Sequence, residues 1–302
     1  MLAIVIPYFK QTFFEKTLQS LANQTNQDFK VYVGDDASPE NPQKLLKKFS
    51  DKFNLKYHRF DENLGNTALT KHWERSIDLI ENEQWIMILG DDDVVDKNLV
   101  QEFYNNLDTI NTQKINIIRF ATIVINEHCQ HVSENFNHPV TEFIASSFYR
   151  KFKGNSRSSL SEYVFSRTSF NEYHFKNYPL AWHSDDMAWF DFSKNKPIFT
   201  INDTVVKIRK TNWSISGDCG NVLLKKTAIQ MFFTDLVNNY LHLFSKKQAI
   251  EILYSWEQKI KWDRSLSPLE WLYLVKKYIK NGTMLDLIKL MRRIFLAIFI
   301  VH

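Results

Sequence analysis

The chain has 302 residues, more than one hydrophobic core usually serves, and its 44% hydrophobic and 24% charged residues are typical of a folded globular protein. Its 38 basic and 34 acidic residues leave a net charge of +4, too small to indicate a nucleic acid or another polyanion as partner. Cys129 and Cys219 are its two cysteines, which excludes a disulfide scaffold or a cysteine zinc cluster and favours a cytoplasmic protein.

Short apolar runs alternate with helical patterns at the start of the chain. The runs have the continuous apolar character of parallel strands buried on both faces, and Pro7 interrupts the first, which lacks the basic region of a signal peptide. The alternation predicts an α/β fold with a mostly parallel sheet flanked by helices, whose ligands bind beyond the carboxyl ends of the strands. The four expected strands are residues 2–6, 29–33, 55–60 and 85–89.

The pattern changes after the fourth strand. Asp96 is a suitable N-cap for a helix over residues 97–107. From about residue 218 the pattern is almost entirely helical. We therefore expect a catalytic domain over residues 1–217 and a helical region over residues 218–302. Further strands are expected at residues 115–126, 160–165 and 205–209.

Polar residues follow each of the first four strands. A carboxylate after the second strand can accept hydrogen bonds from a base or from ribose hydroxyls, and the carboxylates clustered after the fourth can hold a hard cation. Magnesium is usually held by one or two carboxylates together with substrate phosphate oxygens, so a nucleoside diphosphate would complete such a site. Turn and capping chemistry is the competing interpretation. The strand-end sequences are Ile6-Pro7-Tyr8, Gly34-Asp35-Asp36-Ala37-Ser38, Glu62-Asn63-Leu64-Gly65 and Gly90-Asp91-Asp92-Asp93.

Taken in this order, the motifs resemble those of the inverting family-2 glycosyltransferases with the GT-A (Rossmann-like) fold, over most of residues 1–216. The chain departs from the family pattern at Ala37, where the family has Gly, and at Gly90, where it has the first acid of its metal-binding motif. The resemblance implies a nucleotide-sugar donor, with uridine as the favoured base, and no nucleic acid. The implied donor-binding residues are Pro7, Tyr8, Asp36, Asn63, Gly65, Asp91, Asp92 and Arg209.

The resemblance also implies a metal and a general base. Asp92, assisted by Asp93, would bind Mn²⁺ or Mg²⁺, and an acidic pair before an aromatic helix places the base at Asp186, with Asp185 as the fallback. The base would take a proton from the hydroxyl of a glycan or lipid-linked acceptor, as in bacterial cell-surface polysaccharide synthesis. A helix start is the competing role for the acidic pair, and the segment 207–216 is expected near the diphosphate.

Two other functional classes share parts of this pattern. A nucleotidyltransferase also combines an α/β sheet with an acidic metal site, but it should carry a glycine-rich phosphate loop after the first strand, where this chain has Pro7-Tyr8-Phe9-Lys10. A non-catalytic nucleotide- or glycan-binding module is disfavoured by the acids present at all three sites. Glycosyl transfer is therefore the preferred function.

The last helical segment is amphipathic. Its polar residues recur every three or four positions and give one basic face, while the apolar run at residues 294–301 is far shorter than a bilayer span. One interpretation is a helix that lies on the inner face of the plasma membrane. The other is a helix that packs on the catalytic domain or on another subunit of an oligomer. The polar residues are Asp286, Lys289, Arg292 and Arg293.

Overall fold

A computed structural model describes residues 1–211 and 220–299. The chain forms two compact units, Met1–Asn221 and Val222–His302. The boundary expected at residue 217 lies outside the described residues. Each unit is described by itself below.

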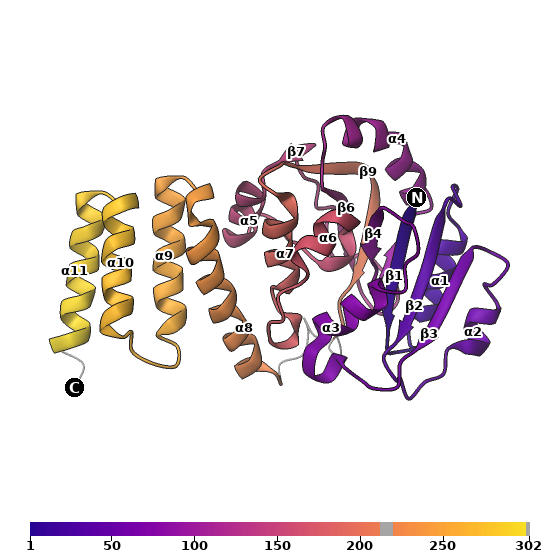
Figure 1. The fold of residues 1–302 in the computed structure, drawn as a ribbon, viewed down its shortest axis with the longest axis horizontal. Helices are drawn as coiled ribbons and strands as arrows, with labels where there is room; N and C mark the ends of the chain where they lie inside the picture. Colours follow the sequence, from indigo (N-terminus) through magenta and orange to yellow (C-terminus); the bar gives the residue numbers. More distant parts are fainter. Residues whose placement is uncertain (212–219, 300–302) are drawn as a thin grey trace. The chain divides into compact units, whose positions relative to one another are not determined.

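The first unit is built on a nine-stranded mixed sheet (Figure 1). Its order is β3-β2-β1-β4-β8-β6-β9-β5, with β7 paired to β9. The strands β3, β2, β1 and β4 are parallel, which confirms the first four expected strands. Strand β8 runs antiparallel to both β4 and β6, while β6 and β9 are parallel. The strands are β1 Leu2–Tyr8, β2 Phe29–Asp35, β3 Asn54–Arg59, β4 Trp85–Ile88, β5 Val94–Val95, β6 Ile117–Ile125, β7 Thr141–Glu142, β8 Tyr163–Ser166 and β9 Ile198–Arg209.

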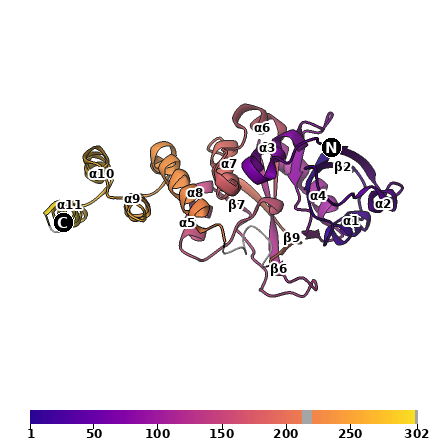
Figure 2. The ribbon, with the colours of Figure 1, turned by 90° about the horizontal axis from the view of Figure 1, so that it is seen from below.

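Helices cover both faces of this sheet. Figure 2 shows α1 and α2 on one side and α3 and α6 on the other. Strand β1 is apolar throughout because alternate side chains enter two cores: Ile4 and Ile6 belong to the cluster that includes Leu18 of α1 and Leu45 of α2. The helices of this unit are α1 Phe14–Ala22, α2 Gln43–Lys47, α3 Gly65–Ile77, α4 Leu99–Thr112, α5 Ile144–Phe152, α6 Arg167–Tyr173 and α7 Ser184–Ser193, with 3₁₀ turns η1 Leu160–Glu162 and η2 Pro179–Ala181.

The capping role expected for Asp96 was wrong. Helix α4 begins at Leu99, and its N-cap residue is Asn98. The Asp96 carboxylate instead forms an ion pair with the Lys207 ammonium at 2.8 Å. Lys207 lies on β9, more than a hundred residues later in the chain, so local sequence could not reveal this partner. The backbone carbonyl of Asp96 still accepts the Leu99 amide, which explains why the helix starts nearby.

The second unit is helical in its described part, as expected. Each of its four long helices has a fully buried apolar side chain, as Phe232, Leu253, Leu274 and Leu290 show. Ser245 and Ser267 cap two of them through reciprocal capping boxes. None of the described helices combines the length and the apolar character needed to cross a bilayer. The elements are α8 Val222–Asp235, a π-helical turn η3 Leu236–Tyr240, a 3₁₀ turn η4 Leu241–Leu243, α9 Lys246–Ile260, α10 Pro268–Asn281 and α11 Met284–Phe299.

Candidate active site

The carboxyl ends of β1, β2 and β4 lie side by side at one edge of the sheet. Tyr8 is in register with Asp35, and the Asp36 amide donates to the Tyr8 carbonyl at 3.0 Å. The Leu89 amide donates in the same way to the Val5 carbonyl at 2.9 Å. The strand-end motifs predicted from the sequence are therefore brought together, as the parallel pairing requires.

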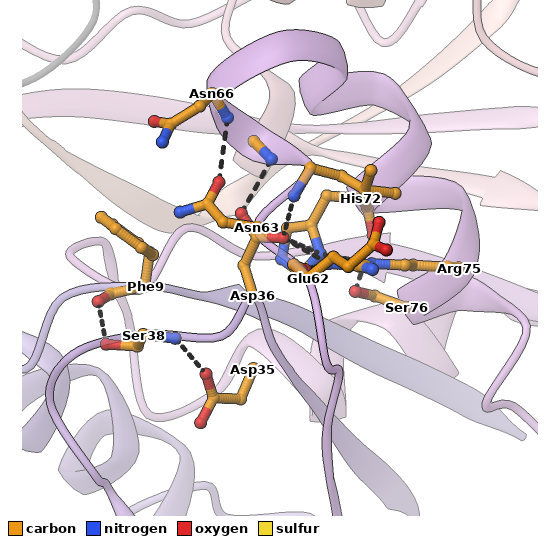
Figure 3. A network of polar contacts seen from close by, with 12 residues as sticks. Phe9, Asp35, Asp36, Ser38, Glu62, Asn63, Asn66, His72, Arg75 and Ser76 are labelled. Atoms are coloured by element: carbon orange, nitrogen blue, oxygen red, sulfur yellow. Dashed lines mark hydrogen bonds and ion pairs between the residues drawn. The ribbon is translucent and has the colours of Figure 1, made fainter.

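Asp36 organises the loop between β3 and α3 (Figure 3). Its buried carboxylate accepts the amides of Leu64 and Gly65 at 2.9 and 2.8 Å, and the Arg75 guanidinium also donates to it. A Cβ at position 65 would lie 2.6 Å from the Asp36 carboxylate, so glycine is needed for this approach. Asn63, which precedes the N-cap residue of α3, accepts the Asn66 amide at 3.0 Å. Donor contacts of Asp36, Asn63 and Gly65 stay a prediction.

Asp35 has a cluster of partners that the sequence analysis did not identify. One carboxylate oxygen accepts the Tyr57 hydroxyl at 2.7 Å and the Arg59 guanidinium at 2.8 Å, and the other accepts the Ser38 amide at 2.8 Å. Burial and the Asp35 charge raise the pKa of Tyr57 to about 12. The Arg59 side chain is 45% exposed, so this cation at the end of β3 is accessible at the strand-end edge. The position of Arg59 at the end of β3, the strand next to β2, is the sequence signal that could have identified it.

Tyr8 lies in the core rather than in an open pocket. Its ring packs on Phe14 with centroids 4.7 Å apart, and its buried hydroxyl donates to the Glu40 carbonyl at 3.0 Å. Burial raises the pKa of the Tyr8 hydroxyl. Direct donor binding by this side chain is therefore disfavoured, while Pro7 is only partly buried at the end of β1.

The three acids after β4 have different surroundings. Asp91 accepts the amides of Phe9 and Lys10, both at 2.8 Å, and thereby holds the loop after β1. Asp93 is buried and accepts the Arg209 amide at 2.8 Å, with the Ser161 hydroxyl as a second partner. Within the described residues, no side chain donates to the Asp92 carboxylate. Asp92 is therefore the acid of this turn that is available to a ligand.

The electrostatics of this turn fit a bound cation. Burial, followed by the charges of Asp93 and Asp91, raises the pKa of Asp92 to about 8, and burial raises the pKa of Asp91 to about 6. A divalent ion would offset both the burial of these carboxylates and the repulsion between them. The described residues contain no group of three or more His, Cys, Asp or Glu side chains placed to hold an ion. Such an ion would take its other ligands from a diphosphate and water, which is common for magnesium.

Gly90 stands where the family pattern has an acid. A Cβ there would lie 3.0 Å from an Asp92 carboxylate oxygen and 3.1 Å from one of Asp93. A larger side chain would therefore crowd the two acids predicted to hold the metal. This departure from the pattern keeps the space around Asp92 open.

Arg209 holds the acidic turn in place through hydrogen bonds to Asp92 and Asp93. Its amide holds Asp93, its Nε donates to the Asp92 carbonyl at 2.9 Å, and its guanidinium also contacts Cys129. The guanidinium lies 4.3 Å from the centre of the Phe13 ring, and the residue is 2% exposed. These contacts disfavour direct binding of the diphosphate and indicate that Arg209 fixes the backbone of the turn. Residues 212–216 of the expected diphosphate segment lie outside the described residues.

The two acids at the start of α7 differ sharply. Asp186 is buried, and both of its oxygens accept the Lys151 ammonium at 2.6 and 2.7 Å, while His183 Nδ1 lies 2.6 Å away. Burial alone would raise the pKa of Asp186, but the Lys151 and His183 charges outweigh it and hold this pKa well below its usual range. No side chain among the described residues donates to the Asp185 carboxylate, whose pKa burial and the Asp186 charge raise to about 6.

The turn before β8 connects the two acidic regions. Ser161 in η1 accepts the Gly90 amide at 3.0 Å, and the nearby Arg157 lines a small cavity together with Lys151 and Asp186. Aromatic side chains near the acidic pair belong to the core: Trp189 is 1% exposed and its ring centroid lies 4.3 Å from that of Tyr163, and Tyr178 is buried.

Comparisons with known proteins bear on the family and the fold of this chain. Residues 3–199 match the family model described as glycosyl transferase family 2. An uncharacterised glycosyltransferase of Mycoplasma genitalium is 29% identical over 106 residues, which cover 34% of this chain. The matched residues make up 35% of the length of that relative, so this chain aligns with about one third of it.

Two solved structures resemble the fold. Residues 1–349 of S. aureus TarS in complex with UDP-GlcNAc superimpose with a TM-score of 0.64 at 14% identity, over 98% of this chain and 81% of that one. GalNAc-T7 with UDP, GalNAc and Mn²⁺ gives a TM-score of 0.53 at 12% identity, over 76% of this chain and 48% of that one. At these identities the likeness shows the fold alone, and it is the mixed α/β fold with a mostly parallel sheet that the sequence predicts.

Proposed function

The chain belongs to glycosyl transferase family 2, and we propose that it moves a sugar from a uridine-diphospho-sugar to an acceptor hydroxyl with inversion at the anomeric carbon. The observation that carries the proposal is a pair of carboxylates without side-chain donors in the described part of the chain: Asp92 at the strand ends and Asp185 at the start of α7. Asp92 would act on the leaving diphosphate through a bound cation, and Asp185 would accept the proton of the incoming hydroxyl. The acceptor is a glycan or a lipid-linked glycan of the cell surface.

The donor side uses the edge formed by β1, β2 and β4. Arg59, whose side chain is 45% exposed, offers a cation for the edge of the base, and the loop held by Asp36 borders the same edge. The UDP and UDP-GlcNAc in structures of similar fold support a uridine donor. Asp92, assisted by Asp93, would hold Mn²⁺ or Mg²⁺, which when bound neutralises charge on the diphosphate.

The acceptor side uses Asp185 as general base. In the transfer, the acceptor oxygen bonds to the anomeric carbon as the bond from that carbon to the diphosphate oxygen breaks, through an oxocarbenium-like transition state. The hydroxyl proton passes to the Asp185 carboxylate, and the nucleoside diphosphate leaves. A pKa of about 6 leaves Asp185 largely ionised at neutral pH, yet basic enough to accept the proton.

Asp186 is proposed as the support for this base rather than the base itself. A carboxylate held by both Lys151 and His183 has a low proton affinity, and it would have to break an ion pair to reach an acceptor. This assignment reverses the preference implied by the family resemblance, which favours Asp186. The reason is the ion pair with Lys151, a residue of the distant helix α5.

A thermal-shift panel of nucleotide sugars tests the donor class. With manganese present, we expect a UDP-sugar to raise the Tm, because a ligand that binds only the folded protein stabilises it by mass action. GDP-, ADP- and CMP-sugars at the same concentration serve as controls. A Tm raised equally by all of them, or by none, would contradict the uridine assignment.

A further inference from the structure

The outer face of α11 carries an unusual concentration of exposed apolar side chains. Phe295 is 55% exposed and Ile288 57%, although both are large hydrophobic residues in a regular helix. Isolated exposed apolar residues are ordinary, but a stripe along a whole helix marks a surface that binds something. We call this the α11 face; its apolar members are Met284, Leu285, Ile288, Met291, Phe295 and Leu296.

The charged residues of α11 are sorted between its two sides. Arg293 points inward, where its Nε lies 3.0 Å from both Glu257 oxygens and its Nη2 donates to the Tyr278 hydroxyl at 3.1 Å. The Asp286 carboxylate accepts the Thr283 amide and hydroxyl, and the Thr283 hydroxyl accepts the Asp286 amide at 3.3 Å, so Asp286 is used at the start of the helix. Lys289 and Arg292 are exposed and form no ion pair with a described residue. The sequence pattern that placed Arg293 on the basic face was wrong, and the α11 face carries Lys289 and Arg292 alone.

The net charge of the whole second unit is positive, like that of the two exposed cations on the α11 face. Residues 222–302 contain 13 Lys and Arg against 6 Asp and Glu, an excess of +7, whereas residues 1–221 contain 25 against 28, an excess of −3. The neighbouring helix α10 repeats the composition, since its exposed residues include Leu269, Leu272, Ile279, Lys276 and Lys280. Figure 1 shows α10 and α11 side by side.

These charges decide between the two occupants that an apolar helix face commonly has. A second copy of the chain would bring its own Lys289 and Arg292, and another unit of charge +7, against the same face. Like charges that meet in an interface disfavour it. An anionic lipid surface instead complements both groups, because the apolar side chains enter the acyl boundary while the cations meet the headgroups.

We propose that the α11 face lies in the interface of an anionic lipid bilayer and holds the protein on the membrane surface. The helix lies parallel to the surface, because its described residues do not form a span. The proposal rests on the contacts and charges of the second unit and is independent of the donor and the base assigned above.

Vesicle sedimentation with the full chain tests the proposal. Vesicles of phosphatidylcholine with about one-third phosphatidylglycerol should bind the protein, and vesicles of phosphatidylcholine alone should not. Reversing both cations, Lys289→Glu with Arg292→Glu, should weaken binding at least about 20-fold, since each basic residue near such a surface contributes about fivefold. Met291→Gln with Phe295→Gln, which changes no charge, should weaken it as well.

Lys44→Glu with Lys47→Glu is the matched control, because it makes the same change of charge at exposed positions of α2 in the first unit. It should keep at least half of the binding, which would exclude an effect of net charge alone. Circular dichroism verifies that every variant is folded. The proposal is overturned if the full chain ignores anionic vesicles, or if the α11 variants bind as the wild type does. It is also overturned if they abolish a dimer seen by analytical ultracentrifugation without changing vesicle binding.

Discussion

Replacing Asp185 by asparagine is expected to lower kcat by at least about 100-fold, the lower bound for a general base, while the affinity for nucleoside diphosphate barely changes. Asparagine keeps the size of the side chain and removes the group that accepts the proton. No described side chain donates to the Asp185 carboxylate, so the substitution breaks no ion pair that holds α7 in place. Steady-state kinetics together with calorimetric titration of UDP separates the two effects.

Asp186→Asn is the matched control at the adjacent position. It removes the partner of Lys151, whose side chain is 26% exposed, so it should lower the free energy of unfolding, by about 1–3 kcal/mol. Turnover measured below its Tm should fall less than in Asp185→Asn. If instead folded Asp186→Asn loses turnover and Asp185→Asn keeps it, the base is Asp186, as the family resemblance implies.

The pH profile gives a second readout of the same base. Asp185 must be ionised to accept a proton, and its pKa is about 6, so kcat/KM should fall about tenfold per unit as the pH drops below 6. The residual activity of Asp185→Asn should lack this acid limb. An acid limb that survives unchanged in the variant belongs to another group.

Asp92→Asn is expected to remove the metal dependence of donor binding. In the presence of manganese, the affinity for UDP should fall by more than roughly 100-fold, the upper end of the effect for groups that only support a metal ligand. Asp92 is the acid of its turn that no described side chain occupies, so no other interaction is lost with the charge. Calorimetric titration of UDP with manganese and with EDTA measures the effect.

Asp96→Asn is the control for this experiment, because Asp96 lies four residues further along and pairs with Lys207. It should bind UDP with manganese as the wild type does. An Asp92→Asn protein that keeps both the affinity and the metal dependence would show that the metal is held elsewhere.

Much of the fold could be predicted because its signals are local. The strands β1, β2 and β4 are largely buried on both faces, so their sequences are mostly apolar, with Lys30 as the charged residue inside β2, and the residues that follow them are polar. Parallel pairing then requires their carboxyl ends to meet, so the sequence alone predicts that Asp36 and Asp92 lie at one edge of the sheet.

The roles of individual side chains could not be predicted because they depend on distant partners. Asp185 and Asp186 are adjacent and chemically identical in the sequence, and Lys151, which distinguishes them, lies 35 residues from Asp186. The sequence motif predicts that Arg209 binds the diphosphate, whereas in the structure its guanidinium contacts the Asp92 carbonyl and Cys129. In each case a tertiary contact decides which polar group remains available to a substrate.

The identity of the products shows which reaction the protein catalyses. The protein would be incubated with a UDP-sugar, manganese and candidate glycan acceptors, and the products analysed by mass spectrometry and by NMR of the anomeric proton. We expect free UDP and a glycoside whose anomeric configuration is opposite to that of the donor, both reduced in Asp185→Asn. Release of pyrophosphate, or a glycoside that retains the donor configuration, would contradict it.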